Sequence, residues 1–362
     1  MAKHFPIENS AVIDPEKLSQ GIDNLLFNCA ELKPKDELLI IREKESLDWY
    51  KNDVSELLKS EAINKGLKTK VIEVGEPDNS NKNSLLTAVN EHTCTIFFAR
   101  LGDQDRFEEK KYYSKRVMSY VRSAEQLAST FGTINYKANV AFKNSIDKIF
   151  NNAREVVISC PLGTNLKGYI DNKSQKISSE VSVIRFPLVV PKPIECLSFS
   201  GNVVIDNYLT STGSKVYKPN FLKINKQTNF VINKGRISNI EGEVTDVENI
   251  KKHYKNISKE FHLDSDCVHS WHPGLHPAVT YSKPIDKDPD QWSNTMFASP
   301  RFLHFHTCGN YAPGEICWML EKHSVFIDNK PLWKRGCLMP YNFKETSECI
   351  EKYKELINLY NN

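Results

Sequence analysis

The fold is indicated first by residues 37–74, ELLIIREKESLDWYKNDVSELLKSEAINKGLKTKVIEV. Glu37–Ile41 is a short apolar run, which is typical of a buried strand. In Tyr50–Lys65 the apolar residues recur at helical spacing, and Gly66 stands where a helix C-cap belongs. Lys68–Val74 then alternates as a second strand. This order predicts a β-α-β unit of a mostly parallel sheet.

The same alternation continues along the chain. Leu85–Glu91 has the spacing of a short helix, and Cys94–Phe98 is a third apolar strand. We expect helices over Lys115–Gln126 and Lys137–Asn152, followed by a strand over Arg154–Ser159. The N-terminal part of the chain is therefore predicted to be a Rossmann-like α/β domain.

The pattern changes after Pro161, where helical periodicity largely disappears. One helix is expected near Thr245–Phe261, and Lys234-Gly235 is a hairpin-turn signal. The short β-like runs are Val181–Phe186, Gly201–Asp206, Phe221–Asn225, Phe230–Asn233 and Arg236–Glu241. We place a boundary near residue 155, with an α/β parallel-sheet domain in residues 1–155. Residues 156–362 are predicted to form a mostly β, α+β domain that carries the functional site.

The composition excludes several classes of partner. Lys and Arg (48) nearly balance Asp and Glu (45), so the chain lacks the excess of positive charge that is typical of nucleic-acid-binding proteins. No apolar run approaches the roughly 18 residues of a membrane span. The polar N-terminus has no apolar signal region, so we expect a cytoplasmic protein. The nine scattered cysteines then indicate reduced thiols.

Histidines are concentrated in one part of the sequence. Six of the ten lie between residues 269 and 323. Five of these fall in two groups, HSWHPGLHP (residues 269–277) and HFHTCGNY (residues 304–311). Neutral imidazole is the commonest metal ligand in proteins, so the two groups are candidate ligand segments.

The second group has strand spacing. If it is a strand, His304 and His306 lie on one face, and Cys308 shares that face as long as the strand continues. Three ligands with an open position are what a catalytic metal needs. The alternative is that the HxH pattern, which is short and common, is only hydrogen-bonded core. Pro273 and Pro277 predict that the first group is a loop.

Several short motifs also occur in a fixed order. They are PLGTNL (161–166), GNVVID (201–206), NKGRISNIEG (233–242), GLHP (274–277) and VFID (325–328) with Gly336. In this order they resemble the aminopeptidase T family of dinuclear metallopeptidases. The related 2,5-dihydroxypyridine dioxygenases share that fold and use a single iron. The resemblance covers most of residues 115–340 and implies a homodimer.

The resemblance also implies the positions of site residues. The family motif H-I-A-x-G-x-x-Y matches His304 and Tyr311. In the peptidases that His is a metal ligand and that Tyr assists catalysis. Both residues are therefore candidates here.

Most of the family's other ligands are altered. Its two glutamates correspond to Val190 and Ser270, and its H-W-D pair corresponds to Cys317 and Met319. The dioxygenases have a His in place of the second glutamate, one residue away from His269. A second cation without carboxylates would lack charge compensation. We therefore do not expect dinuclear aminopeptidase activity.

The first hypothesis is an enzyme with a rebuilt mononuclear site that holds one iron or zinc ion. The candidate ligands are His269, His272, His304 and His306, and the candidate catalytic residues are Tyr311 and His306. The candidate substrate-binding residues are Trp271, His276 and Trp318. The reaction would be oxidative or hydrolytic, on a small aromatic compound or a short peptide, and would suit specialised metabolism.

The second hypothesis is a non-catalytic protein without a cofactor. It would bind a peptide or small molecule in the cleft that corresponds to the active site of the resembled family. Apolar residues at former ligand positions make a drier pocket, which favours binding over metal chemistry. A third hypothesis is metal-free acid–base or Cys/His chemistry at Cys308 or Cys317.

Overall fold

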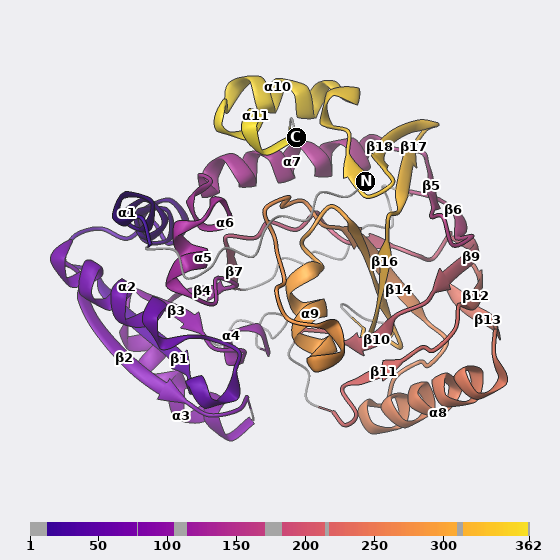
Figure 1. Cartoon of the computed structure of the whole chain (residues 1–362), viewed down its shortest axis with the longest axis horizontal. Coiled ribbons are helices and arrows are strands. Elements are labelled where there is room, and N and C mark those ends of the chain that lie inside the picture. The colour runs from indigo at the N-terminus through magenta and orange to yellow at the C-terminus, as the bar shows by residue number, and fades with distance from the viewer. Residues whose placement is uncertain are drawn as a thin grey trace.

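The computed structural model describes residues 13–77, 79–104, 114–170, 183–213, 217–309 and 314–360. It contains one parallel sheet with flanking helices and two antiparallel sheets. In Figure 1 the parallel sheet lies on the left and the antiparallel strands lie on the right. This mixed architecture confirms the predicted α/β fold class.

The parallel sheet has the strand order β2-β1-β3-β4-β7. Its strands are β1 (Glu37–Glu43), β2 (Lys68–Val74), β3 (Cys94–Phe98), β4 (Lys115–Ser119) and β7 (Ile184–Phe186). The crossover helices α2 (Asn52–Asn64) and α3 (Asn79–Glu91) connect β1 to β2 and β2 to β3. β3 is buried along its whole length, as expected for a strand covered on both faces.

The helix expected over Lys115–Gln126 was a wrong prediction. This segment is strand β4, and the helix that follows is the short α5 (Ala124–Ala128), capped by Ser123. Val117 and Met118 are both buried, because β4 lies inside the sheet. A short apolar run of this kind cannot be assigned to helix or strand from its periodicity alone.

Strand β7 comes after the boundary that we placed near residue 155. It pairs in parallel with β4, so the chain returns to the parallel sheet after it has left it. Two antiparallel strands, β5 (Glu155–Ser159) and β6 (Asn165–Tyr169), precede this return. The division into residues 1–155 and 156–362 therefore stays a prediction.

The antiparallel strands form two sheets. The eight-stranded sheet contains, in order, β13 (Arg236–Glu241), β12 (Thr228–Asn233), β9 (Ser200–Ile205), β6, β5, β17 (Ser324–Ile327), β18 (Lys330–Lys334) and β19 (Cys337–Leu338). The six-stranded sheet contains, in order, β11 (Phe221–Lys223), β10 (Tyr208–Ser211), β16 (Ile316–Glu321), β15 (Phe302–Thr307), β14 (Val268–Pro273) and β8 (Ile194–Glu195).

The predicted Lys234-Gly235 hairpin turn is confirmed between β12 and β13. Lys234 and Gly235 have φ of +50° and +71°, as a type I′ turn requires.

The remaining α-helices complete the fold. They are α1 (Pro15–Asp23), α4 (Leu101–Gln104), α6 (Thr130–Thr133), α7 (Tyr136–Asn152), α8 (Val244–Phe261), α9 (Pro289–Met296), α10 (Lys344–Lys352) and α11 (Glu355–Tyr360). Phe142 of α7 stacks on Tyr360 of α11 with ring centroids 4.4 Å apart. Helices α10 and α11 therefore lie over α7, whereas α9 lies in the middle of the molecule (Figure 1).

The core consists of two clusters, and the six-stranded sheet lies between them. Trp271, Phe305 and Trp318 belong to the cluster shared with the eight-stranded sheet. Met319 and Phe297 belong to the cluster built on the parallel sheet. One face of the six-stranded sheet therefore packs toward the parallel sheet, and this face carries the candidate site.

Gly274, which directly follows β14, allows a close backbone contact. A Cβ on this residue would lie 2.3 Å from both the carbonyl carbon of Ala298 and the oxygen of Ser299. We expect Gly274→Ala to lower the free energy of unfolding by about 1–3 kcal/mol, as overpacking does. Urea denaturation measures this change. Gly75→Ala is the control, because no atom lies within 4 Å of a Cβ there. Equal stability of the two variants would contradict the prediction.

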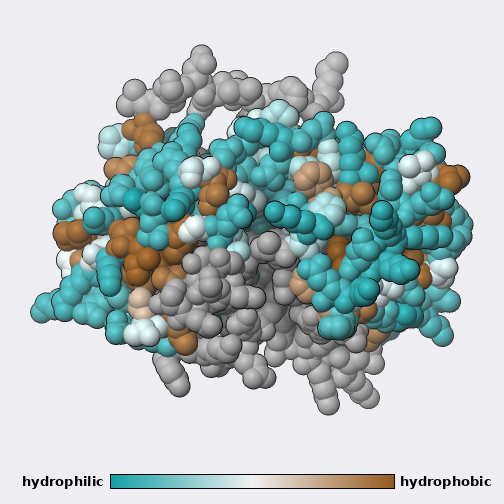
Figure 2. Space-filling model, turned by 90° about the horizontal axis from the view of Figure 1, so that it is seen from below, coloured by the Kyte–Doolittle hydropathy of each residue, from teal (hydrophilic) through white to brown (hydrophobic). Residues whose placement is uncertain are grey.

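The described helices include none that is both long and apolar enough to cross a membrane. Figure 2 shows one face of the molecule, on which hydrophobic residues form small groups among hydrophilic ones. This pattern agrees with the charged fraction of 26%.

Candidate metal centre

Two neighbouring strands bring the predicted histidines together. In the antiparallel pairing of β14 with β15, His272 lies opposite His304 and Ser270 lies opposite His306. Residues directly opposite one another in such a pair point to the same face of the sheet. The strand predicted for His304 and His306 is therefore confirmed, and His272 joins its face from β14.

The loop predicted for the first histidine group (residues 269–277) was wrong over residues 269–273. These residues belong to β14, and Pro273 is its last residue. A proline at the end of a strand removes no hydrogen bond from the middle of the sheet, so the strand tolerates it. His272 is therefore held by backbone pairing on β14 and does not lie in a loop.

Strand β16 extends the same face on the other side of β15. Met319 lies opposite His304, and Cys317 lies opposite His306. The Sγ atom of Cys317 is 3.8 Å from Nδ1 of His306 and 2.9 Å from Oγ1 of Thr212. Cys317 thus lies beside His306 and within hydrogen-bond distance of the Thr212 hydroxyl group.

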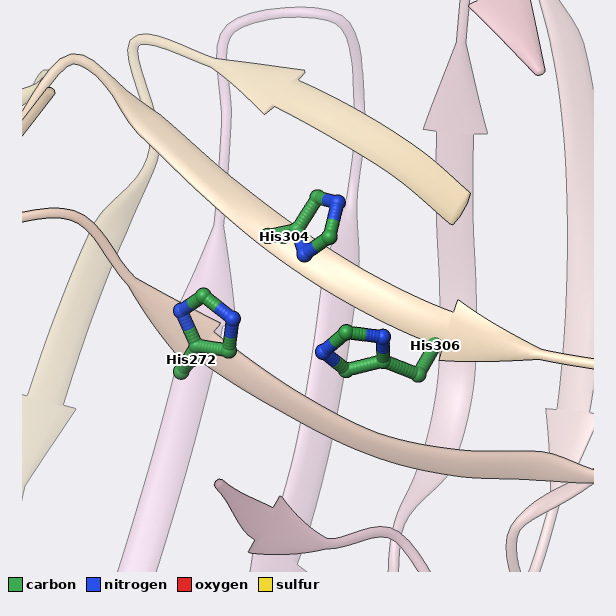
Figure 3. A group of neighbouring side chains, drawn as sticks. All are labelled: His272, His304 and His306. Carbon is green, nitrogen blue, oxygen red and sulfur yellow. The ribbon is translucent and has the colours of Figure 1, made fainter. Parts of the chain in front are cut away.

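The side chains of His272, His304 and His306, here called the His triad, point toward one another (Figure 3). One ligand atom from each ring lies within 4.8 Å of the other two. The ring centroids are 4.7 Å apart for His304 and His306, 5.2 Å for His272 and His304, and 5.3 Å for His272 and His306. All three side chains are buried. Within the part of the chain that the structure describes, no other group of three His, Cys, Asp or Glu residues has metal-binding spacing.

The His triad fits a single ion of the imidazole-binding metals. Three nitrogens bound to one tetrahedral ion at 2.0–2.1 Å lie about 3.3 Å apart, so binding would draw the rings together by up to about 1.5 Å. Imidazole ligands suit zinc and iron. Three neutral ligands leave the full charge on the ion, which favours Lewis-acid chemistry at the remaining open position.

Phe297 is a site residue that the sequence did not reveal. It directly follows α9, and its ring centroid lies 6.2 Å from that of His272 and 5.8 Å from that of His304. The available signal was an Asp288 N-cap with Pro289 at the first helical position. We predicted no helix over residues 289–296, so neither α9 nor Phe297 was expected at the site.

His269 lies near the His triad but outside it. It occupies the extra position of a β-bulge, where the register shifts between Val268 and Ser270. Its Nδ1 is 2.8 Å from the hydroxyl oxygen of Ser270, and burial lowers its pKa. The bulge thus separates His269 from the three converging rings.

The proposed substrate-binding residues lie elsewhere. Trp271 and Trp318 are fully buried on the opposite face of the six-stranded sheet, because side chains alternate along a strand. The Trp318 indole N–H donates to the hydroxyl oxygen of Tyr254 over 2.8 Å. His276 is buried against Phe131, and this burial lowers its pKa to about 4. We therefore do not include these three residues in the site.

The two remaining candidates have different outcomes. Cys308 lies beyond the end of β15 and has φ of +56°, so the strand does not continue and Cys308 does not share the face of the His triad. Its Sγ is 3.9 Å from the backbone oxygen of Tyr254, in the core. Tyr311 lies outside the described residues.

Known structures share this fold. No protein-family model matches the sequence, and neither does any curated protein. The chain resembles the structure of 2,5-dihydroxypyridine dioxygenase from Pseudomonas putida KT2440, with a TM-score of 0.63 and 12% identity over 93% of this chain and 100% of that one. It also resembles AmpT from Thermus thermophilus, with a TM-score of 0.50 and 11% identity over 90% and 99% of the two chains. At these identities the likeness shows the fold alone. It confirms the fold relationship that the motifs predicted.

Proposed function

We propose that the protein is a mononuclear metal enzyme in which the His triad holds one iron or zinc ion. The convergence of three buried imidazoles on adjacent strands carries this proposal. The fold shared with a dioxygenase and with AmpT supports it. The bound ion would supply Lewis-acid or redox chemistry at its open position. The substrate would be a small aromatic compound or a short peptide.

The surroundings of the His triad favour one ion over two. The positions matching the family's other ligands are Val190, Ser270, Cys317 and Met319, and all four are buried. None is a carboxylate, so a second cation would keep its charge uncompensated in a buried place. Phe297 and Met319 would keep bulk water away from the imidazoles and favour an apolar substrate.

The homodimer and the role of Tyr311 in the proposal rest on the family resemblance alone. We propose a cytoplasmic homodimer with a role in specialised metabolism. In this proposal Tyr311 is an acid or a hydrogen-bond donor to the substrate.

A second candidate function is metal-free binding of a peptide or small molecule. The observation that favours it is the set of soft or apolar side chains, Val190, Cys317 and Met319, at the former ligand positions. In this case the imidazoles of the His triad would donate hydrogen bonds to the ligand and accept hydrogen bonds from it.

Elemental analysis of the untagged protein, purified without chelator, decides between the two functions. We expect about one equivalent of iron or zinc per chain, because three imidazoles and one open position make a catalytic site for a single ion. Protein that is metal-free and also fails to take up added iron, zinc or manganese would contradict the enzyme and support the binding protein.

A further inference from the structure

A second group of polar residues lies at the carboxyl ends of the parallel strands. The chain leaves β1 toward β2 on one side and returns to β3 on the other, so the strand order reverses between β1 and β3. Crevices at such switch points are the usual ligand sites of open α/β sheets. Here Glu43 ends β1 and pairs with Arg100, which follows β3.

Two guanidinium groups lie over one indole ring near this point. The Cζ atoms of Arg100 and Arg122 are 4.4 Å and 4.7 Å from the centroid of Trp49. Arg122, which follows β4, also lies 5.6 Å from the ring centroid of Tyr50. Both aromatic residues are buried. The aromatic rings hold the Arg122 guanidinium in place through its faces and leave its edges for hydrogen bonds.

The two arginines differ in how their donors are used. Glu43 accepts hydrogen bonds from the side chain and the backbone N–H of Arg100. Within the described part of the chain, Arg122 has one side-chain hydrogen bond, from Nη2 to Oδ1 of Asn294 at 3.2 Å. Its Nε and Nη1 atoms are buried without a hydrogen-bond partner. Arg122 is therefore a partly desolvated cation with unused donors.

Nearby carboxylates are already engaged elsewhere. Asp103 accepts from the hydroxyl group of Tyr120, and Asp53 accepts from the backbone N–H of Ala124. Arg122 forms no ion pair with any residue that the structure describes. A water molecule would satisfy these N–H groups but would leave the charge of a partly desolvated cation uncompensated, which is costly. An anion would satisfy both requirements.

Helix α9 links this place to the His triad. Asn294, the partner of Arg122, is three residues before Phe297, so both lie on one side of the helix, about 4.5 Å apart along its axis. Phe297 contacts His272 and His304, and its ring centroid is 5.7 Å from that of Tyr120. Helix α9 therefore connects Arg122 to the His triad through direct side-chain contacts.

We infer that Arg122 is the binding residue for the carboxylate of a small aromatic ligand, with Trp49 and Tyr50 beside it. A guanidinium group matches the planar carboxylate better than any other cation does. That this ligand is also the substrate rests on the proposed function, whereas the carboxylate site itself does not require a metal.

The test measures benzoate binding to the metal-free protein by calorimetry, with benzamide as the uncharged probe of the same shape. We expect the wild type to prefer benzoate. Arg122→Met should weaken benzoate binding about 10- to 100-fold and leave benzamide binding unchanged, since hydrogen bonds to a charged group are the strong ones. Arg301→Met is the matched control, because Arg301 is exposed, pairs with Glu321 and lies over Phe302.

Two further measurements separate the effect of Arg122 on benzoate binding from effects on folding and on metal binding. Benzoate should raise the melting temperature of the wild type and of Arg301→Met but not that of Arg122→Met. Benzoate binding should persist in metal-free His304→Ala, so failure of the metal proposal would leave it unchanged. Equal benzoate affinity of the wild type and Arg122→Met, no preference over benzamide, or Arg122-dependent binding of inorganic phosphate as tight as that of benzoate would overturn the inference.

Discussion

His304→Ala is expected to remove both the bound metal and the activity. The ring centroid of His304 lies 4.7 Å from that of His306 and 5.2 Å from that of His272. Without it two imidazoles remain, which is fewer than the three protein ligands of catalytic zinc sites. Loss of a residue that only orients a ligand costs about 10- to 100-fold, so loss of a ligand should exceed about 100-fold in affinity and turnover.

Elemental analysis after dialysis, together with a turnover assay, measures this effect. His269→Ala is the control, because His269 is also a buried histidine on β14 but sits in the bulge outside the His triad. It should keep about one equivalent of metal. The melting temperatures of the metal-free wild type and metal-free His304→Ala should be similar, which separates ligand loss from misfolding. Full metal content and activity in His304→Ala would exclude the triad as the ligand set.

The sequence predicted the parts of the site that depend on local periodicity. The HxH pattern places His304 and His306 on one face of any strand that contains them. The order of the loose motifs also indicated the shared fold, although 12% identity leaves little signal in single residues. Both predictions rest on features that a short stretch of chain determines by itself.

What the sequence left open or missed depends on pairing between distant segments. Both His269 and His272 were candidate ligands, and the sequence does not decide between them. His272 reaches the His triad only because β14 pairs with β15 in one register, and a shift by one residue would present Trp271 instead. This register places Trp271 in the core, and the register of β16 on β15 does the same for Trp318, although both had been candidates for the site. The contact of Arg122 with Asn294 joins residues 172 positions apart, which no local pattern reveals.

Acid is expected to destabilise the metal-free protein strongly between about pH 6.5 and pH 4. Among the buried histidines, three have a strongly lowered pKa: burial lowers that of His253 and His276 to about 4 and that of His323 to about 3. The ordinary pKa of 6.5 returns on unfolding. Below pH 6.5 the unfolded chain therefore binds more protons, and the stability present above that pH is lost as the pH falls. Each histidine contributes about 2–3 kcal/mol to this loss at pH 4.5.

One buried carboxyl group acts in the opposite direction. Burial raises the pKa of Asp290 to about 7, so this group stabilises the folded chain at low pH and loses that contribution as the pH rises through 7. A single carboxyl group offsets about one of the three histidines. The net loss of stability on acidification should therefore still be several kcal/mol.

Urea denaturation at pH 7.5 and pH 4.5, in the presence of a chelator, measures this difference without the effect of metal release. His323→Leu should reduce the difference between the two pH values by about 2–3 kcal/mol, whatever it does to stability at either pH. His262→Asn is the control, because His262 is exposed and its left-handed φ of +55° suits Asn.

If the stability difference between the two pH values is the same in His323→Leu and in the wild type, His323 accepts a proton in the folded chain as readily as in the unfolded one. Its complete burial beside Trp333 would then have to open in acid, since an enclosed imidazolium without a counter-ion is not stable there.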